Sequence, residues 1–326
     1  MDVDNTPTRV EELWFSDSGL VVQAEQSLFR VSGAVLAARS PIFKDMLSFM
    51  QPPDAETIDG CPVVRLPDLA IDITCFFRAI FDSSFFESYP AQVDFVDVLS
   101  ILRCSDKYEV EYLRRRALVH LSYNFPTTLS AFDAQESSTN FDDIQDVDDR
   151  TSVCIAVIQL ARQTNALWLL PKAFYELATT DNETIRGALQ CTTFNGQPAT
   201  LSANDEMLFL TSSLHISRLE GDVVSFLHCT NRLPCAKGDI CSIARLRALA
   251  QVQTYISNVV GPIPLDLCEL ASVWDGLLEN CCVGCYVWLQ DTHARARQSI
   301  WDKLPGICEL PPWPELEKMK ADALKD

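Results

Sequence analysis

The start of the chain alternates short β-prone runs with short stretches of helical spacing. Residues 20–32 (LVVQAEQSLFRVS) contain two apolar runs separated by polar residues near 24–26, a pattern that predicts a β-hairpin. Apolar residues then recur at spacings of three and four over 33–49, where Pro41 interrupts the pattern. We therefore expect two short helices, joined at Pro41, after the hairpin.

Longer helical periods follow one further strand. Residues 62–66 carry two adjacent valines after a loop rich in Pro and Asp, and they predict a third strand. Helical spacing of apolar residues then returns in three stretches: 73–81, 95–102 and 113–121. A small sheet with packed helices, an α+β fold, is the expected architecture of this part of the chain.

An acidic segment separates the two halves of the chain. From Asp133 to Asp149 there are seven acidic residues and no Lys or Arg, with little apolar content to order the segment. We interpret residues 129–150 as an acidic linker. The first domain is then expected over 12–128, after a disordered N-terminus at 1–11.

Beyond the linker, the apolar pattern is almost wholly helical. The stretches with helical spacing are 152–162, 171–178, 202–227, 240–256 and 266–303, the last with possible breaks. Ser202 followed by Asp205 resembles a helix start, in which a side-chain oxygen accepts from first-turn amides. Residues 151–326 are therefore expected to form a mainly α-helical domain of unknown type.

Composition narrows the classes of function. A net charge of -19 disfavours direct binding of nucleic acid, which needs a concentrated basic surface. The first residues do not resemble a signal peptide, and the longest apolar segment, 152–161, is too short to span a membrane. The 13 cysteines are odd in number, which favours reduced thiols. We expect the chain to lie inside the cell, in the cytoplasm, the nucleus or both.

A specific resemblance starts at the end of the hairpin. The segment FRVSGAVLAARSPIFKDML (29–47) resembles the signature of BTB/POZ domains, L-x-x-x-S-x-x-F-x-x-M-[FL]. The matching positions are Leu36, Ser40, Phe43, Met46 and Leu47. Words such as LAARSPIF and KYEVEYLRRRAL are also similar to BTB proteins that are abundant in mushroom-forming (basidiomycete) fungi. The resemblance implies a protein-interaction domain over roughly the first 125 residues, which can bind other proteins or self-associate.

The chain departs from this family at two positions. Ser32 and Gly33 stand where the family usually has His and then Lys or Arg. In BTB dimers that act in transcriptional repression, the resemblance would have Asp17 face a cation at position 33, and glycine cannot supply one. The departure therefore disfavours the repressor function.

Two short patterns suggest binding chemistry. BTB adaptors that recruit the ubiquitin ligase scaffold cullin-3 use a hydrophobic-x-Glu pattern, and Phe85-Phe86-Glu87 stands at that kind of place. The alternative is that the two phenylalanines end a core helix and Glu87 is solvated. We therefore take Phe85 and Glu87 as candidate contacts to cullin-3.

Cysteines cluster twice in the second half, and a tetrahedral zinc site needs four such ligands. The set that we select is Cys229, Cys235, Cys282 and Cys285. The alternative is that these cysteines are small buried hydrophobes, because Cys282 and Cys285 fall three apart on an expected helix.

The sequence contains no G-x-S-x-G, H-E-x-x-H or G-x-x-x-x-G-K-[ST] motif, so we expect no enzyme and no catalytic residue. The predicted function is a non-enzymatic adaptor, in its sharpest form a substrate receptor for a cullin-3 ubiquitin ligase. The alternative is a nuclear regulator whose helical domain holds a structural zinc, the one cofactor that the sequence suggests.

Overall fold

The computed structural model describes residues 6–49, 56–135, 147–179, 186, 189, 192–194, 197–228, 235–259, 261–266 and 271–325. The chain divides into two compact units. The N-terminal unit is built mainly from residues up to 124, and the helical unit from residues 125 to 322. Within the described residues, no helix is both long enough and apolar enough to cross a membrane.

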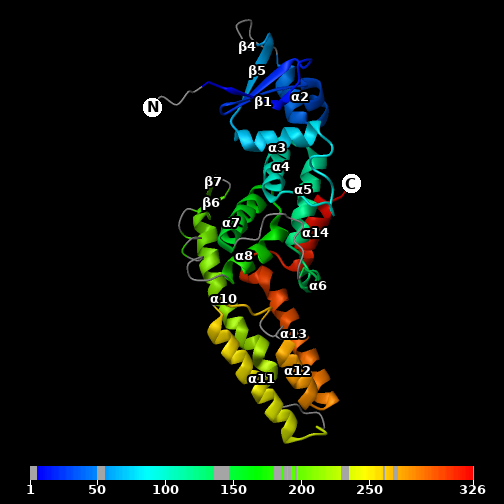
Figure 1. The fold of residues 1–326 in the computed structure, drawn as a ribbon, viewed down its shortest axis with the longest axis vertical. Helices are drawn as coiled ribbons and strands as arrows, with labels where there is room; N and C mark the ends of the chain where they lie inside the picture. Colours follow the sequence, from blue (N-terminus) through cyan, green and yellow to red (C-terminus); the bar gives the residue numbers. More distant parts are fainter. Residues whose placement is uncertain are drawn as a thin grey trace. The chain divides into compact units, whose positions relative to one another are not determined.

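The N-terminal unit is built on a small mixed sheet (Figure 1). Its strands are β1 (Thr8–Trp14), β2 (Leu20–Ala24), β3 (Ser27–Val31), β4 (Thr57–Ile58) and β5 (Cys61–Leu66), in the order β1-β3-β2-β5-β4. β2 and β3 form the antiparallel hairpin that the apolar runs predicted. β1 and β5 lie parallel to β3 and β2, respectively.

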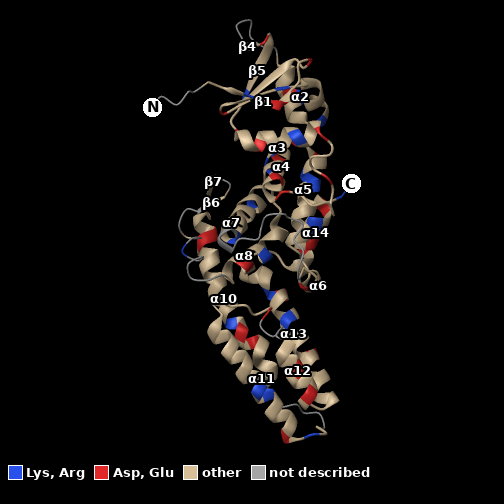
Figure 2. Cartoon of the chain, viewed as in Figure 1, with Lys and Arg blue, Asp and Glu red and all other residues tan. Residues whose placement is uncertain are grey.

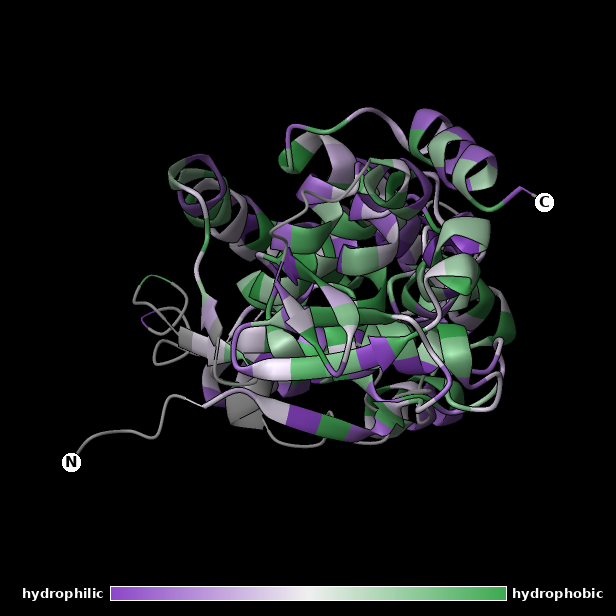
Figure 3. Cartoon of the chain, turned by 90° about the horizontal axis from the view of Figure 1, so that it is seen from above, coloured by the Kyte–Doolittle hydropathy of each residue, from purple (hydrophilic) through white to green (hydrophobic). Residues whose placement is uncertain are grey.

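The expectation of disorder over 1–11 is wrong for its last residues, because β1 begins at Thr8. Most residues of the strand are hydrophilic (Figure 3), and most of its side chains are exposed. Its order comes from backbone pairing with β3 and from Arg9, whose guanidinium binds Asp59 at 2.9 Å and lies over the Trp14 ring. β3 and Asp59 are distant in sequence from Arg9, so the local pattern gave no sign of these contacts. Residues 1–5 lie outside the described part of the chain.

Two short helices follow the hairpin and meet at Ser40, as Pro41 predicted. Helix α1 (Gly33–Arg39) ends there and α2 (Pro41–Ser48) begins. The Ser40 hydroxyl accepts from the amide of Phe43 at 3.0 Å and donates to the carbonyl of Tyr108 at 2.5 Å. One buried serine therefore caps a helix and ties it to a segment that follows much later in the chain.

Aromatic rings fill the space between the sheet and the helices of the N-terminal unit. The three predicted helices are present as α3 (Ala70–Phe81), α4 (Phe95–Lys107) and α5 (Glu111–Asn124). The rings of Phe29, Phe43, Phe76, Phe77 and Tyr108 are almost fully buried and contact one another. This core fixes the outer surface of the unit.

The helical unit confirms the mainly helical prediction for the second half. Its helices are α6 (Leu129–Asp133), α7 (Val147–Gln163), η1 (Leu167–Leu169), α8 (Leu170–Ala178), α10 (Ala203–His228), α11 (Asp239–Asn258), α12 (Ala271–Asn280), α13 (Val283–Ile307) and α14 (Trp313–Ala323). A small hairpin of β6 (Thr192–Phe194) and β7 (Gln197–Ala199) interrupts the helical pattern. The long helices α10, α11 and α13 each carry acidic and basic residues together (Figure 2), unlike a continuous basic face for nucleic acid.

The predicted linker at 129–150 is partly ordered. Helix α6 occupies its first residues, and α7 begins before its end. Asp133 accepts two hydrogen bonds from the guanidinium of Arg297, at 2.6 and 3.0 Å, and the Trp301 indole donates to the carbonyl of Thr127 at 3.1 Å. Residues 125–135 are therefore part of the helical unit. Residues 136–146 lie outside the described chain.

Candidate metal centre and interaction surface

Four cysteines of the helical unit come together at the start of two helices. Their Sγ atoms all lie within 4.8 Å of one another: Cys235, Cys241, Cys282 and Cys285. The Sγ atoms of Cys235 and Cys285 are 3.6 Å apart. Thiolates at such spacing are ligands for a soft metal ion, so this cluster could hold a metal.

Local structure brings the four thiols together. Gly238, with a positive φ of 51°, turns the chain into α11 and leaves Cys241 in the first helical turn. In the same way Cys282 is the N-cap of α13, and Cys285 lies in its first turn. Both helices therefore direct their N-termini, where the helix dipole and free amides favour negative charge, toward the sulfur atoms.

Backbone amides also point at the sulfur atoms. The amide of Cys282 donates to the Sγ of Cys241 at 3.2 Å. The amides of Cys285 and Ala236 lower the pKa of the Cys282 thiol to about 6, and the amide of Lys237 lowers the pKa of Cys235. Burial instead raises the pKa of Cys241. Most of these contacts favour the thiolate form that a metal ion requires.

Lys237 connects the two segments that carry the cysteines. Its ammonium group donates to the carbonyls of Asn280 and Cys281, at 3.4 and 3.1 Å. The Cys281 side chain is also buried nearby, but it is not one of the four, and burial raises its pKa to about 11. The cluster is thus a defined set with one neighbouring cysteine left out.

The sequence selected three of these four cysteines. Cys235, Cys282 and Cys285 lie together, whereas Cys229 lies outside the described residues. Cys241 completes the cluster and was missed. The signal was present, because Cys241 follows Cys235 at the same spacing at which Cys235 follows Cys229.

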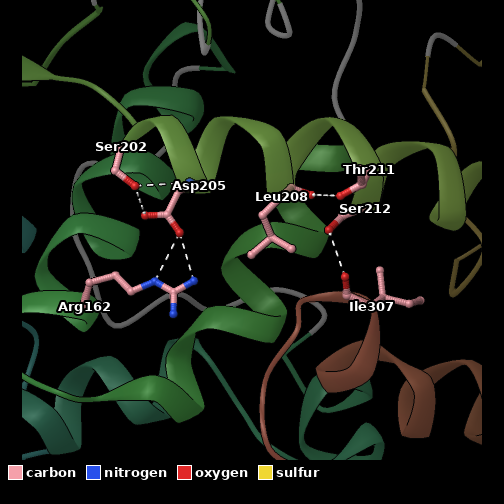
Figure 4. Close-up of polar contacts among 7 residues, drawn as sticks. All are labelled: Arg162, Ser202, Asp205, Leu208, Thr211, Ser212 and Ile307. Carbon is pink, nitrogen blue, oxygen red and sulfur yellow. Dashed lines mark hydrogen bonds and ion pairs between the residues drawn. The ribbon is translucent and has the colours of Figure 1, made fainter.

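A cleft of about 960 Å³ opens elsewhere in the helical unit, lined by residues of α7 and α10 and by Cys308. Arg162 of α7 binds Asp205 of α10 at 2.9 Å, and the Ser202 hydroxyl donates to the same carboxylate at 2.8 Å (Figure 4). Ser202 also accepts from the Asp205 amide, which confirms the predicted helix start. The Cys308 thiol lines the cleft, but burial raises its pKa to about 12 and keeps it protonated. The cleft therefore offers an ion pair that joins two helices rather than an activated thiol.

In the N-terminal unit, the candidate pocket residues gather at one end of the sheet. Asp17 is exposed in the turn before β2, and Ser32 and Gly33 follow β3 directly. Since β2 starts beside the end of β3, these positions lie at the same end of the hairpin. Ser32 caps α1 by accepting from the amide of Val35. A Cβ at Gly33 would lie 3.3 Å from Leu47, so the position has little room for a side chain without movement of that leucine.

The segment of residues 85–87, which follows α3, has two residues at least partly exposed and one buried. Phe85 is half-buried beneath the guanidinium of Arg78, 4.1 Å from its ring, and Glu87 is exposed. Phe86 is only 1% exposed and contacts His120, whose Nε2 donates to the carbonyl of Glu87 at 2.9 Å. The buried Phe86 and His120 thus fix Phe85 and Glu87 in place.

The comparisons with known proteins identify the N-terminal unit. A family model described as "BTB/POZ domain" matches residues 9–124. A search of curated proteins found no match to the chain.

Proposed function

We propose that the chain, whose residues 9–124 form a BTB/POZ domain, acts as a non-enzymatic adaptor that joins two proteins. BTB domains are protein-interaction modules, and this one binds a scaffold protein or a second BTB domain. The helical unit then presents a surface that captures another protein. The family match carries this proposal, and the signature residue Ser40 supports it by capping α2 and binding Tyr108.

The scaffold that we propose is cullin-3. Phe85 offers a half-buried apolar ring, with the guanidinium of Arg78 over one face. Glu87 offers a solvated carboxylate two residues later, and the buried Phe86 holds both on a fixed backbone. Aromatic anchors of this kind carry much of the binding free energy in protein interfaces.

The test is binding of the full chain to cullin-3 from the same cell, measured by isothermal titration calorimetry. Phe85→Ala and Glu87→Ala are each expected to weaken binding at least about tenfold, or 1.4 kcal/mol. Phe49→Ala is the matched control, because Phe49 is another aromatic residue of this domain and is 74% exposed. Binding that survives both substitutions would remove these residues as the contact, and no binding by the unaltered chain would remove cullin-3 as the scaffold.

Self-association is the other use of the BTB domain that we propose to test. Asp17 and Gly33 lie at the same end of the hairpin, but glycine brings no cation to face the carboxylate. We therefore expect that Asp17→Ala leaves any dimer unchanged in analytical ultracentrifugation. Dissociation of the dimer by this substitution would show that the Asp17 carboxylate takes part in a charged contact between the two chains.

One observation, the thiol cluster, favours the alternative of a nuclear regulator whose helical unit holds a structural zinc. The net charge of -19 and the mixed charges of the long helices favour action through protein partners rather than direct DNA contact. Imaging of the tagged chain tests this alternative, and exclusion from the nucleus would remove it.

A further inference from the structure

The four-thiol cluster belongs to the helical unit and carries an inference that does not depend on the adaptor function. We infer that Cys235, Cys241, Cys282 and Cys285 bind one Zn²⁺ as a closed tetrathiolate site. We infer further that this ion, rather than apolar packing, holds the segment before α11 against the turn between α12 and α13.

The spacing of the sulfur atoms fits tetrahedral zinc. Zn–S bonds of about 2.3 Å at tetrahedral angles place the sulfur atoms about 3.8 Å apart. The four Sγ atoms lie within 4.8 Å of one another, and one pair is 3.6 Å apart. Packing of cysteines as small hydrophobes would need no such convergence of all four Sγ atoms on one point.

The surroundings of the sulfur atoms suit negative charge. Cys241, Cys282 and Cys285 stand at the N-termini of α11 and α13, and the amide of Cys282 donates to the Sγ of Cys241. The ammonium group of Lys237 lies beside the turn that carries Cys282. A tetrathiolate zinc site has a net charge of -2, which these groups balance in part.

Apolar packing is scarce where the ion would act. Residues 235–240 are all exposed, so no side chain of this segment is buried against the rest of the unit. Ile240 is 55% exposed and Val283, on the facing turn, is 80% exposed. Hydrogen bonds from Lys237 and the contacts of the cysteine sulfurs connect these two segments.

The donor set also indicates the type of site. Four thiolates select a soft ion such as zinc over Mg²⁺ or Ca²⁺, which prefer oxygen. Four protein ligands leave no open position for water or substrate, so the site is structural rather than catalytic.

The experiment measures metal in the full chain, purified in the presence of a thiol reductant, by inductively coupled plasma mass spectrometry. We expect one zinc per chain, and we expect Cys241→Ser to lose it. There are two matched controls. Cys281→Ser changes the buried cysteine next to the cluster, and Cys229→Ser changes the cysteine that the sequence analysis selected in place of Cys241. Both controls should keep the metal.

Two further readouts keep the inference testable if Cys241→Ser does not fold. Cobalt added to the metal-free chain should give the visible bands of tetrahedral thiolate coordination, and chelation should expose residues 235–240 to limited proteolysis. Absence of zinc, iron in its place, or loss of zinc in Cys229→Ser but not in Cys241→Ser would each overturn the inference. Binding of the BTB domain to its partner should continue after chelation, because the metal lies in the helical unit. A failure of the BTB domain to bind would therefore count against the adaptor proposal and not against the metal site.

Discussion

The core of the BTB domain and the segment that enters α11 are held in different ways. In the BTB domain, buried aromatic rings meet between a sheet and its helices. Residues 235–240, which lead into α11, are all exposed, and sulfur contacts and Lys237 connect them to the segment that leads into α13. The helices α11–α13 themselves bury apolar side chains such as Leu249, Val273 and Leu289. One chain therefore combines a core stabilised by burial with a segment that is held by a few polar and sulfur contacts.

Removal of one buried ring should produce the largest effect. Phe77 is fully buried and contacts the rings of Phe29 and Phe43, so Phe77→Ala is expected to destabilise the BTB domain by about 3–5 kcal/mol. Denaturant unfolding followed by circular dichroism measures this change. Phe49→Ala should stay within about 0.5 kcal/mol of the unaltered chain. An equal decrease in the unfolding free energy of the helical unit would show that the two regions do not unfold separately.

Chelation of zinc should destabilise the helical unit and leave the BTB domain unchanged. A ligand at 100 to 1,000 times its Kd stabilises the folded state enough to shift the midpoint of a domain of this size by about 5–15 °C. We expect calorimetry to show this loss in the transition of the helical unit and no change in that of the BTB domain. An unchanged helical transition would place the order of α11–α13 in packing rather than in the metal.

The ion pair between Asp133 and Arg297 should have an intermediate effect. The Arg297 side chain is 11% exposed and donates twice to Asp133, so Asp133→Ala is expected to destabilise the helical unit by about 1–3 kcal/mol. The control is Asp222→Ala, because Asp222 pairs with Lys303 at the surface, where both side chains are about half exposed. Equal effects of the two substitutions in chemical unfolding would contradict a structural role of the predicted linker.

Buried His293 should add an effect that is absent at neutral pH and appears only in acid. Burial, and secondarily Arg297, lowers the pKa of His293 to about 4, and its Nε2 has no hydrogen-bond partner among the residues that the structure describes. The unfolded chain then binds a proton below about pH 6.5 that the folded chain does not, so stability should be complete above that pH. Between about pH 6 and 4 it should fall by up to about 1.4 kcal/mol per pH unit.

His293→Phe keeps a ring beside Phe226 and Trp274 but removes the titration. The difference in unfolding free energy between this variant and the unaltered chain should therefore grow as the pH falls. A constant difference from pH 7 to 4 would show that His293 does not contribute to the pH dependence.

Local sequence was sufficient for the elements whose stability is local. The hairpin at 20–31, the division at Pro41 and most of the long helices followed from apolar spacing and from one proline. β1 and α6 did not, because their partners lie far away in the chain. The small hairpin β6–β7 did not, because each of its strands has only three residues. Helix α6 has only five residues, and the ring of Phe132 packs against Trp301.

The cysteine cluster shows the same limit of local information. Cys229 and Cys241 flank Cys235 at equal distances in the sequence, so spacing alone could not choose between them. The turn at Gly238 brings Cys241 to the cluster, because α11 begins at Asp239, two residues before that cysteine. The pairing with Cys282 depends on the tertiary position of a second helix, which no spacing rule encodes.

The attachment of residues 125–135 to the helical unit has a consequence for recombination between related genes. A crossover within the acidic segment would separate Thr127 and Asp133 from Trp301 and Arg297, their partners in the original chain. A crossover just after Asn124 would keep all four together and exchange only the BTB domain. Functional chimaeras are therefore expected to join at the end of α5, not at the most polar stretch of the sequence.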